Sequence, residues 1–379
     1  MDTKKKILIL YASAGHGHEK AARAIGEVLS DKKDSAAVTL IDTLTLTRGS
    51  FGDRYKNGYI YMIQRFPSLW GFFYYLTDIA AVYFLIRPFR RLVNAFEAAP
   101  LHKKILDEAP DIVISTHFMA TEVVSHLKQK GRTSTVLINV VTDYLAHAFW
   151  LAPGVDRYAV GSSETVADLR RRGIPAQKIV STGIPIEKKF SQTQDRASLR
   201  DRFGVPQDAF AVLVTSGGAG VGSLLSLIDE ILKVPRGIHV FAVCGTNEKL
   251  LVSMKGLAEK NPRLHPFGFV NNIQELMSAS DVVVGKGGGL TVSESLSMGR
   301  PLILYGSVPG QETRNVQCMT KHGVALPAFS YADVLRFLTD FVDQPDLLRR
   351  YTENALRIGR PKAAQEIVDL AYSIVDEQS

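Results

Sequence analysis

Two histidines stand in a glycine-rich loop near the start of the chain, in the run SAGHGHEK over residues 13–20. His18 falls near the start of an expected helix, where the helix dipole disfavours a cation and favours a neutral imidazole. Because a neutral imidazole can accept a proton, His18 is a candidate general base. His16 is a second imidazole in this loop, and either side chain could instead only cap the helix or bind backbone.

Two more side chains suited to proton transfer follow apolar runs of strand length. His117 comes after the run that ends near residue 115, and Asp143 comes after the run LINVVT. Loops that follow parallel strands lie at the edge of the sheet where ligands bind. Either residue could be the base or the partner that orients it, and each could equally be structural.

The elements around the first loop predict a strand, a glycine loop and a helix. Residues 5–12 form a short apolar run, and residues 19–29 place apolar side chains on one helical face, namely Ala21, Ala22, Ile25, Val28 and Leu29. This unit begins a doubly wound α/β domain. The dinucleotide fingerprint G-x-G-x-x-G is not met, because only Gly15 and Gly17 fit it.

The second half of the chain repeats this pattern. Residues 210–233 again predict a strand, a glycine loop and a helix. The polar stretch over 181–203 that precedes them is predicted to be a linker. In the run GKGGGLTVSESLSMG, Gly288 and Gly289 precede a helix, so backbone N–H groups could approach a diphosphate there. Thr291 adds a hydroxyl, and Glu294 is placed to accept hydrogen bonds from ribose. Lys286 is positioned to help hold the diphosphate.

The run PGQETRN follows the next apolar strand. It offers Gln311, Glu312 and Asn315, an amide and carboxylate set suited to sugar hydroxyls. A glycine loop followed by this set predicts a nucleotide-sugar site in the second domain.

Length and charge narrow the class of protein. A chain of 379 residues predicts two domains. Residues 1–190 contain 26 Lys and Arg against 18 Asp and Glu, a net charge of +8, whereas residues 191–379 carry −1. A basic first half predicts an anionic partner, and no nucleic-acid-binding module is recognisable. Two cysteines predict no disulfide framework and a reduced, cytoplasmic setting.

Residues 51–96 suggest what the anionic partner is. They hold 14 of the 33 aromatic residues, with six Arg or Lys and two Asp. The length of the run 68–86, 19 residues with one charge, is typical of a membrane span, but that charge, Asp78, lies at its centre. We expect an interfacial segment instead, with Trp and Tyr at headgroup depth and arginines on lipid phosphates. The residues proposed for this role are Trp70, Tyr74, Arg87, Arg90 and Arg91. A buried pair of core helices is the alternative.

Nearly the whole chain resembles the diacylglycerol glycosyltransferases of glycosyltransferase family 28. That family includes the plastid monogalactosyldiacylglycerol synthases, the bacterial processive diacylglycerol glucosyltransferases and the peptidoglycan transferase that makes lipid II. In the first half the family motifs are matched by Gly15, His16, Gly17, His18, the run VVTD over 140–143, His147 and Trp150. In the second half they are matched by Gly217, Gly218 and Gly220, by CGTN over 244–247, by GFV over 268–270, by KGGGLT over 286–291 and by PGQE over 309–312.

The resemblance implies an α/β GT-B fold, in which two Rossmann-like domains face across a cleft. We expect domains over 1–185 and 186–358, with a helix over 359–379 returning to the first. It also implies donor contacts from Gly218, Gly245, Asn247, Phe269, Val270 and Leu290, and acceptor contacts from His16, Gly17, His147 and Trp150. The catalytic candidates stay His18, Asp143 and His117.

The activity implied by the resemblance is inverting transfer of a hexose from UDP-glucose or UDP-galactose to diacylglycerol. No cofactor or metal is expected, since enzymes of this fold stabilise the leaving diphosphate with helix N-termini and basic groups. The expected location is the inner face of the cell membrane, as a peripheral cytoplasmic protein on an anionic surface. The alternatives are a UDP-N-acetylglucosamine-dependent transferase acting on another lipid, and a UDP-sugar binder or epimerase that transfers nothing.

Overall fold

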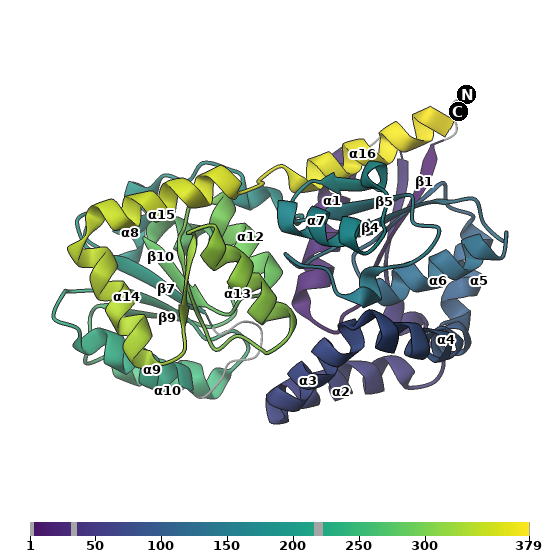
Figure 1. Cartoon of the computed structure of the whole chain (residues 1–379). Helices are drawn as coiled ribbons and strands as arrows, with labels where there is room; N and C mark the ends of the chain where they lie inside the picture. The colour runs from purple at the N-terminus through teal and green to yellow at the C-terminus, as the bar shows by residue number, and fades with distance from the viewer. Residues whose placement is uncertain (1–3, 32–35, 216–222, 379) are drawn as a thin grey trace. The chain divides into compact units, whose positions relative to one another are not determined.

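The computed structural model describes residues 4–31, 36–215 and 223–378 (Figure 1). By their contacts these residues group into two units. Unit 1 comprises 1–188, 308–315 and 360–379, and unit 2 comprises 189–307 and 316–359. Each unit is built on one parallel six-stranded sheet. The expected α/β fold with two Rossmann-like sheets is therefore confirmed.

The sheet of unit 1 has the strand order β2-β1-β3-β4-β5-β6. Its strands are β1 (Lys5–Tyr11), β2 (Ala36–Asp42), β3 (Ile112–Ser115), β4 (Val136–Val140), β5 (Arg157–Val160) and β6 (Ile179–Ser181). Its helices are α1 (His16–Asp31), α2 (Phe51–Arg65), α3 (Pro67–Asp78), α4 (Ala80–Glu97), α5 (Ala99–Glu108), α6 (Phe118–Gln129), α7 (Ser163–Arg171) and α16 (Ala363–Gln378). The strand–loop–helix unit expected at the start of the chain is confirmed.

Alternate residues of each buried strand supply the two faces of this sheet. Ile7 and Ile9 of β1 pack with α1 and α16, whereas Leu8 and Leu10 pack with α5 and α6. This follows from the period of two along a strand, and it explains why the central strands are mostly apolar on both faces. The direction of the connections reverses between β1 and β3. Loops after these two strands thus diverge at the carboxyl edge, the position where open α/β sheets bind ligands.

The sheet of unit 2 has the order β12-β11-β10-β7-β8-β9. Its strands are β7 (Ala211–Thr215), β8 (His239–Val243), β9 (Leu264–Phe267), β10 (Val282–Gly285), β11 (Leu302–Tyr305) and β12 (Ala325–Ala328). Its helices are α8 (Arg196–Phe203), α9 (Ser223–Lys233), α10 (Glu248–Ala258), α11 (Ile273–Ala279), α12 (Gly289–Ser297), α14 (Tyr331–Asp343) and α15 (Pro345–Ile358). Helix α13 (Gln311–Lys321) begins in unit 1 and ends in unit 2. The switch point of this sheet lies between β7 and β10.

The polar stretch 181–203 is only partly a linker, which corrects the sequence interpretation. Residues 196–203 form α8, which begins at the Asp195 cap and packs on α11. Arg200 of α8 is buried and pairs with Asp281 at 2.9 Å. A charged residue can be buried when it is paired, and the sequence pattern alone did not reveal this partner.

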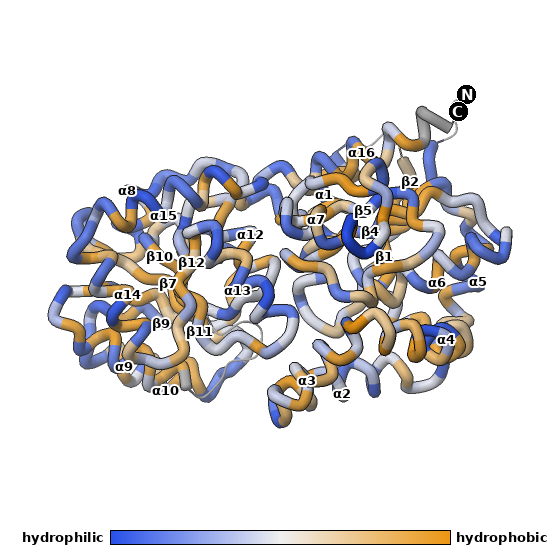
Figure 2. The backbone as a smooth tube through the Cα atoms, viewed as in Figure 1, coloured by the Kyte–Doolittle hydropathy of each residue, from blue (hydrophilic) through white to orange (hydrophobic). Residues whose placement is uncertain are grey.

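The aromatic segment 51–96 forms three helices, α2, α3 and α4. No single helix in the described part of the chain has the length and apolar composition to cross a membrane. Helices α3 and α4 reach that length only as a pair, and they are bent by 95° to each other. Figure 2 shows hydrophobic residues along α3 and α4.

Candidate active site

His18 lies in the first turn of α1, at the switch point of the unit 1 sheet. Its Nδ1 lies 2.6 Å from the carbonyl oxygen of Thr116 and 3.1 Å from Oγ1 of Thr142. A carbonyl only accepts, so Nδ1 carries the proton and Nε2 of the neutral ring keeps its lone pair. Burial lowers the pKa of His18 to about 4, against a smaller opposing effect of the Thr116 bond. The ring is therefore neutral near pH 7, as expected, but burial is the main cause.

His117 has the opposite tautomer. It caps α6, and its Nδ1 accepts a hydrogen bond from the backbone N–H of Met119 at 3.3 Å. Its proton is therefore on Nε2, so neither ring nitrogen is open to a proton from a substrate. Burial and the nearby His18 hold the pKa of His117 well below its usual value. These contacts give His117 a structural position beside His18, whose ring centroid lies 4.7 Å away.

Asp143 lies in the loop that follows β4. Burial raises its pKa to about 6, while a hydrogen bond from Asn315 acts in the other direction. The Nδ2 of Asn315 lies 3.4 Å from Oδ1 of Asp143. A carboxylate with this pKa is mostly ionised at pH 7 and is more basic than an ordinary aspartate. Among the three catalytic candidates, Asp143 has the protonation properties best matched to a general base.

His147 and Trp150 hold the loop after β4 in place, which corrects their expected role as acceptor contacts. The Nδ1 of His147 accepts from the N–H of Phe149 at 3.1 Å, and its Nε2 donates to the carbonyl of Tyr74 at 2.9 Å. Trp150 is buried in the core between the sheet and α6. Both ring nitrogens of His147 are used within the protein and Trp150 is buried, so neither side chain is available to a ligand in this arrangement.

Tyr74 faces Val308–Asn315 of unit 1 and Trp70 packs on α2, which corrects their assignment to the membrane. A Cβ at Gly310 would lie 2.9 Å from the ring of Tyr74, so the helix and this loop are in close contact. The ring of Trp70 packs on Tyr59 of α2 at 5.2 Å. Other positions of α3 carry exposed apolar side chains, namely Leu69, Phe72, Phe73 and Tyr75.

The three arginines of α4 have different surroundings. Arg90 lies 3.2 Å from buried Glu122 of α6 and stacks on Phe149 at 4.2 Å. This arginine is therefore part of the core, contrary to the expectation that it meets lipid. Arg91 is 3.8 Å from Glu122, and Arg87 is partly exposed. The expected lipid contact thus remains for Arg87 and Arg91 only.

The start of α1 carries the remaining residues of the first loop. His16 is exposed and Gly17 is partly exposed. A Cβ at Gly15 would meet nothing within 4 Å, so the space beside this loop is open. His16 is therefore accessible to a ligand, and His18 follows two residues later, where it is less exposed.

In unit 2, the expected diphosphate loop lies at the switch point of the sheet. It runs from Lys286 to Gly288, and Gly288 caps α12, whose first turn contains Gly289, Leu290 and Thr291. The first N–H groups of a helix have no partner within it, so they are donors for an anion. A Cβ at Gly288 would meet nothing within 4 Å, which leaves room for a ligand. The other loop expected here contains Gly218, which lies outside the described residues.

Glu294 lies one turn further along α12, with only 3% of its surface exposed. The sequence predicted that it contacts ribose hydroxyls, and its burial leaves little of the side chain for such a contact. Its role in nucleotide binding stays a prediction.

Two more loops at the carboxyl edge of this sheet carry expected donor residues. Gly245 follows β8 with a φ of 59°, a conformation that glycine adopts without strain. Asn247 caps α10 by accepting from the N–H of Leu250 at 3.0 Å, so it shapes the loop. Phe269 and Val270 follow β9, and the ring of Phe269 is 67% exposed. An exposed ring beside open backbone could stack on a flat base.

Gln311 and Glu312 begin α13 and belong to unit 1 by their contacts. Nε2 of Gln311 donates to the hydroxyl of Tyr59 at 3.0 Å, and its Oε1 is buried without a partner among the described residues. Glu312 accepts from the N–H of Val308 at 2.6 Å and so closes its own loop. Gln311 is thus the member of this pair with an acceptor atom left for a sugar hydroxyl.

Sequence reasoning missed an ion cluster at the end of α3. Asp78 accepts two hydrogen bonds from Arg172, each of 2.9 Å, and one from Arg314 at 2.5 Å. The signal was present, because a charge at the centre of an apolar run needs a buried partner. The contacts of His18 with Thr116 and Thr142 were also missed, since nothing local distinguishes these threonines.

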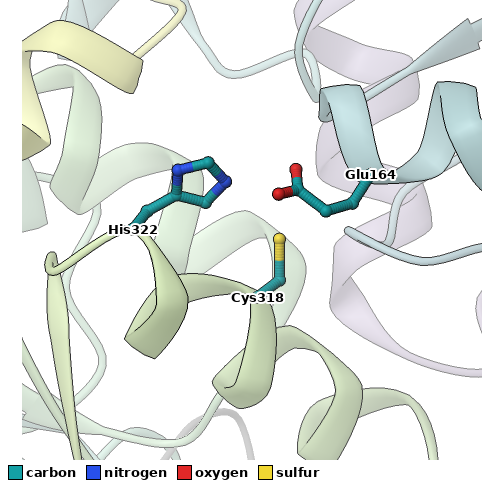
Figure 3. Close-up of side chains that lie close together, drawn as sticks. All are labelled: Glu164, Cys318 and His322. Carbon is teal, nitrogen blue, oxygen red and sulfur yellow. The ribbon is translucent and has the colours of Figure 1, made fainter.

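Cys318 and His322 lie one turn apart at the end of α13 (Figure 3). Figure 3 draws them with Glu164, which belongs to unit 1. Within unit 2 this pair supplies two potential ligands, fewer than a structural metal site uses. We infer no metal centre from it.

Comparison with known proteins agrees with the fold and shows the family. Residues 18–186 match the family described as monogalactosyldiacylglycerol (MGDG) synthase, and residues 211–332 match the glycosyltransferase family 28 C-terminal domain. The processive diacylglycerol beta-glucosyltransferase of Bacillus cereus (strain AH187) is 32% identical over 369 residues, which cover 96% of this chain and 92% of the relative.

Solved structures agree on the fold. Acinetobacter baumannii MurG is 15% identical with a TM-score of 0.64, and the match covers 98% of this chain and 100% of MurG. WaaG, a glycosyltransferase involved in lipopolysaccharide biosynthesis, is 15% identical with a TM-score of 0.57, and the match covers 97% of this chain and 99% of WaaG.

The fold and the family matches define a hexosyltransferase with the two-domain α/β architecture of GT-B enzymes. Within that class, the chain belongs to the diacylglycerol glycosyltransferases of family 28, together with the MGDG synthases and the processive diacylglycerol glucosyltransferases. The resemblance inferred from the sequence motifs is confirmed.

Proposed function

We propose that this enzyme transfers a hexose from a UDP-sugar to diacylglycerol with inversion at the anomeric carbon. The proposal rests on two side chains at the carboxyl edge of the unit 1 sheet. There a neutral His18 and a carboxylate of raised pKa, Asp143, follow β1 and β4 in a chain of this family. The names of its relatives favour glucose as the sugar, and their β product corresponds to inversion of an α-linked donor.

In the proposed mechanism Asp143 removes the proton from the acceptor hydroxyl. A hydroxyl has a single proton, so Nε2 of His18 holds the O–H as the acceptor binds, and the O–H then rotates to Asp143 for the transfer. The oxygen then attacks the anomeric carbon, and the bond from this carbon to the UDP oxygen breaks with both electrons on UDP. The N–H groups that begin α12, together with Lys286, stabilise the charge that develops on the leaving diphosphate. We propose that no metal ion takes part.

A transfer assay tests this function. The purified chain is incubated with vesicles that contain diacylglycerol and, in separate arms, labelled UDP-glucose, UDP-galactose or UDP-N-acetylglucosamine. Lipid chromatography should show a labelled β-glycosyldiacylglycerol with one of the hexoses, and the rate should be unchanged in EDTA. Label that stays in the aqueous phase in every arm, or an epimerised nucleotide sugar, would contradict the proposal.

Gln311 is expected to contact the transferred sugar. Gln311→Ala should lower kcat/KM for the UDP-sugar about fivefold, since one neutral hydrogen bond contributes about 1 kcal/mol. Its affinity for UDP alone should stay within twofold. Steady-state kinetics and calorimetry with UDP measure the two effects. Gln317→Ala, at an exposed position of the same helix, is the matched control, and equal losses for both ligands would contradict a sugar contact.

We also propose that α3 and α4 bind an anionic membrane surface. The outer face of α4 presents Phe84, Leu85, Phe89, Leu92 and Phe96, and Phe84 is 73% exposed. Arg87 and Arg91 lie on this helix, so an apolar face and basic groups occur together (Figure 2). This composition is typical of helices that lie in the interface of a bilayer.

Replacing Arg87 and Arg91 together by glutamine should weaken binding to anionic vesicles by up to about 30-fold. Each basic side chain near such a surface contributes about 1 kcal/mol, and a contribution of 1.4 kcal/mol is tenfold. Vesicle sedimentation at two salt concentrations measures the change. Arg349→Gln, an exposed arginine of α15, is the control. If binding to the vesicles is the same at both salt concentrations and is unchanged by the double substitution, the protein is held by apolar contacts alone.

A further inference from the structure

The side chain of Asn315 is completely buried at the start of α13. Its Oδ1 accepts from the backbone N–H of Tyr144 at 2.8 Å. A backbone N–H can only donate, so the amide is fixed with its oxygen toward Tyr144 and its NH₂ toward Asp143. That NH₂ group lies 3.4 Å from Oδ1 of Asp143. One carboxylate oxygen is thereby engaged, and we expect Oδ2, which has no such contact among the described residues, to take the proton.

The turn that carries Asn315 is itself held by ion pairs. Its neighbour Arg314 binds Asp78 at 2.5 Å, and Asp78 also accepts from the N–H of Ala148 at 2.7 Å. Arg172 binds the same carboxylate with two nitrogens. Burial raises the pKa of Asp78, but the hydrogen bonds from Arg172 and Arg314 outweigh it and hold this pKa below its usual value. The cluster joins α13 to the loop that contains Asp143.

We propose that Asn315 is a positioning residue that holds the Asp143 carboxylate for proton transfer, with the Asp78–Arg314 pair fixing its turn. This inference rests on the proposed function, in which Asp143 is the base. The positioning role replaces the prediction from sequence that Asn315 contacts the sugar of the donor. Its buried amide is already used twice, by Tyr144 and Asp143.

The groups around Asp143 determine how its pKa should change when Asn315 is replaced. Glu312 and Arg314 face it from α13, Tyr59 from α2 and Tyr74 from α3. Burial and Glu312 raise the pKa of Asp143, and Asn315 and Arg314 lower it. Removing the Asn315 donor should therefore favour the protonated carboxyl, which cannot act as a base.

Asn315→Asp is the sharpest test, because aspartate has the same shape and still accepts from Tyr144. A role limited to holding Tyr144 would survive this change. A positioning role would not, because two carboxylates would then share one site and one pKa would rise strongly. The acid limb of the kcat/KM profile should move up by at least one pH unit, a loss of at least about fivefold at pH 6. Recovery is expected at pH 9, with KM for the UDP-sugar changed less than twofold.

Two further variants complete the test. Asn315→Ala removes the donor without adding charge, so its acid limb should move in the same direction even if the aspartate variant folds poorly. Gln317→Glu adds a carboxylate at an exposed position of α13 and should leave the profile unchanged. An equal loss at every pH, with a raised KM for the UDP-sugar, would overturn the proposal and return Asn315 to the donor site.

A measurement without substrate separates this inference from the proposed function. The pKa of Asp143 in the folded chain, about 6, lies above its ordinary value of 3.8, so this group destabilises the fold as pH rises through that interval. In Asn315→Asp the melting temperature should continue to fall as pH rises above 6. Adding Asp143→Asn to this variant should abolish that further fall. If this holds while no transfer is detected, the positioning contact stands and the proposed function fails. If that further fall is missing, the positioning contact is wrong.

Discussion

Replacing Asp143 by asparagine is expected to lower glycosyl transfer about 10²- to 10⁴-fold, the usual contribution of a general base. Asparagine keeps the shape of the side chain and removes its ability to accept a proton. The affinity for UDP should stay within twofold, because the loops proposed to hold UDP belong to unit 2. Single-turnover kinetics and calorimetry with UDP measure the two quantities.

The same substitution should make the protein more stable at neutral pH. A folded-state pKa of about 6 means that the folded chain binds the Asp143 proton more tightly than the unfolded chain does. The contribution of Asp143 to the free energy of unfolding is fully present below pH 4. It is lost as pH rises through 6, and the loss is at most about 3 kcal/mol. Asp143→Asn should therefore raise the melting temperature at pH 8 but not at pH 4. Asp346→Asn, at an exposed site, should change neither value.

An inactive Asp143→Asn variant with no gain in stability at pH 8 would show that the carboxyl of Asp143 is not strained by burial. Full activity would remove it as the base. The acid limb of the wild-type pH profile gives an independent check, since it should fall near pH 6 and disappear in the variant.

Replacing His18 by alanine is expected to lower turnover about 10²-fold, as misplacing a reacting group typically does. Burial lowers the pKa of His18 to about 4, so its ring is a weak base at pH 7 but a good hydrogen-bond acceptor. We therefore expect it to orient the hydroxyl that Asp143 deprotonates. His16→Ala should cost less, because that side chain is exposed at the helix start.

His18→Asn separates catalysis from structure. The amide NH₂ of asparagine can take the place of Nδ1 and donate to Thr116, while nothing replaces Nε2. This variant should melt like the wild type and be as slow as His18→Ala. Recovery of turnover in His18→Asn would mean that only the bond to Thr116 matters, and the hydroxyl would then be held by another group.

The sequence by itself determined the repeated strand–loop–helix units, the two domains and the family. These features are local, because a strand is an apolar run, a helix has an apolar face, and a ligand loop is a set of glycines between them. It also placed His18, Asp143 and the loop over 286–289 at the carboxyl ends of strands, since parallel sheets bind ligands at that edge.

Only the tertiary structure decided what each candidate side chain does. His18 and His117 both follow strands, and the tautomer that separates them depends on whether Nδ1 meets a carbonyl or an N–H. Arg90 and Arg87 lie one turn apart on α4, and buried Glu122 makes only Arg90 a core residue. Asn315 and Asp143 are 172 positions apart in the chain, so no local pattern could join them. Hydrogen bonds and ion pairs select single atoms across the fold, whereas sequence periodicity reports only which face of an element is buried.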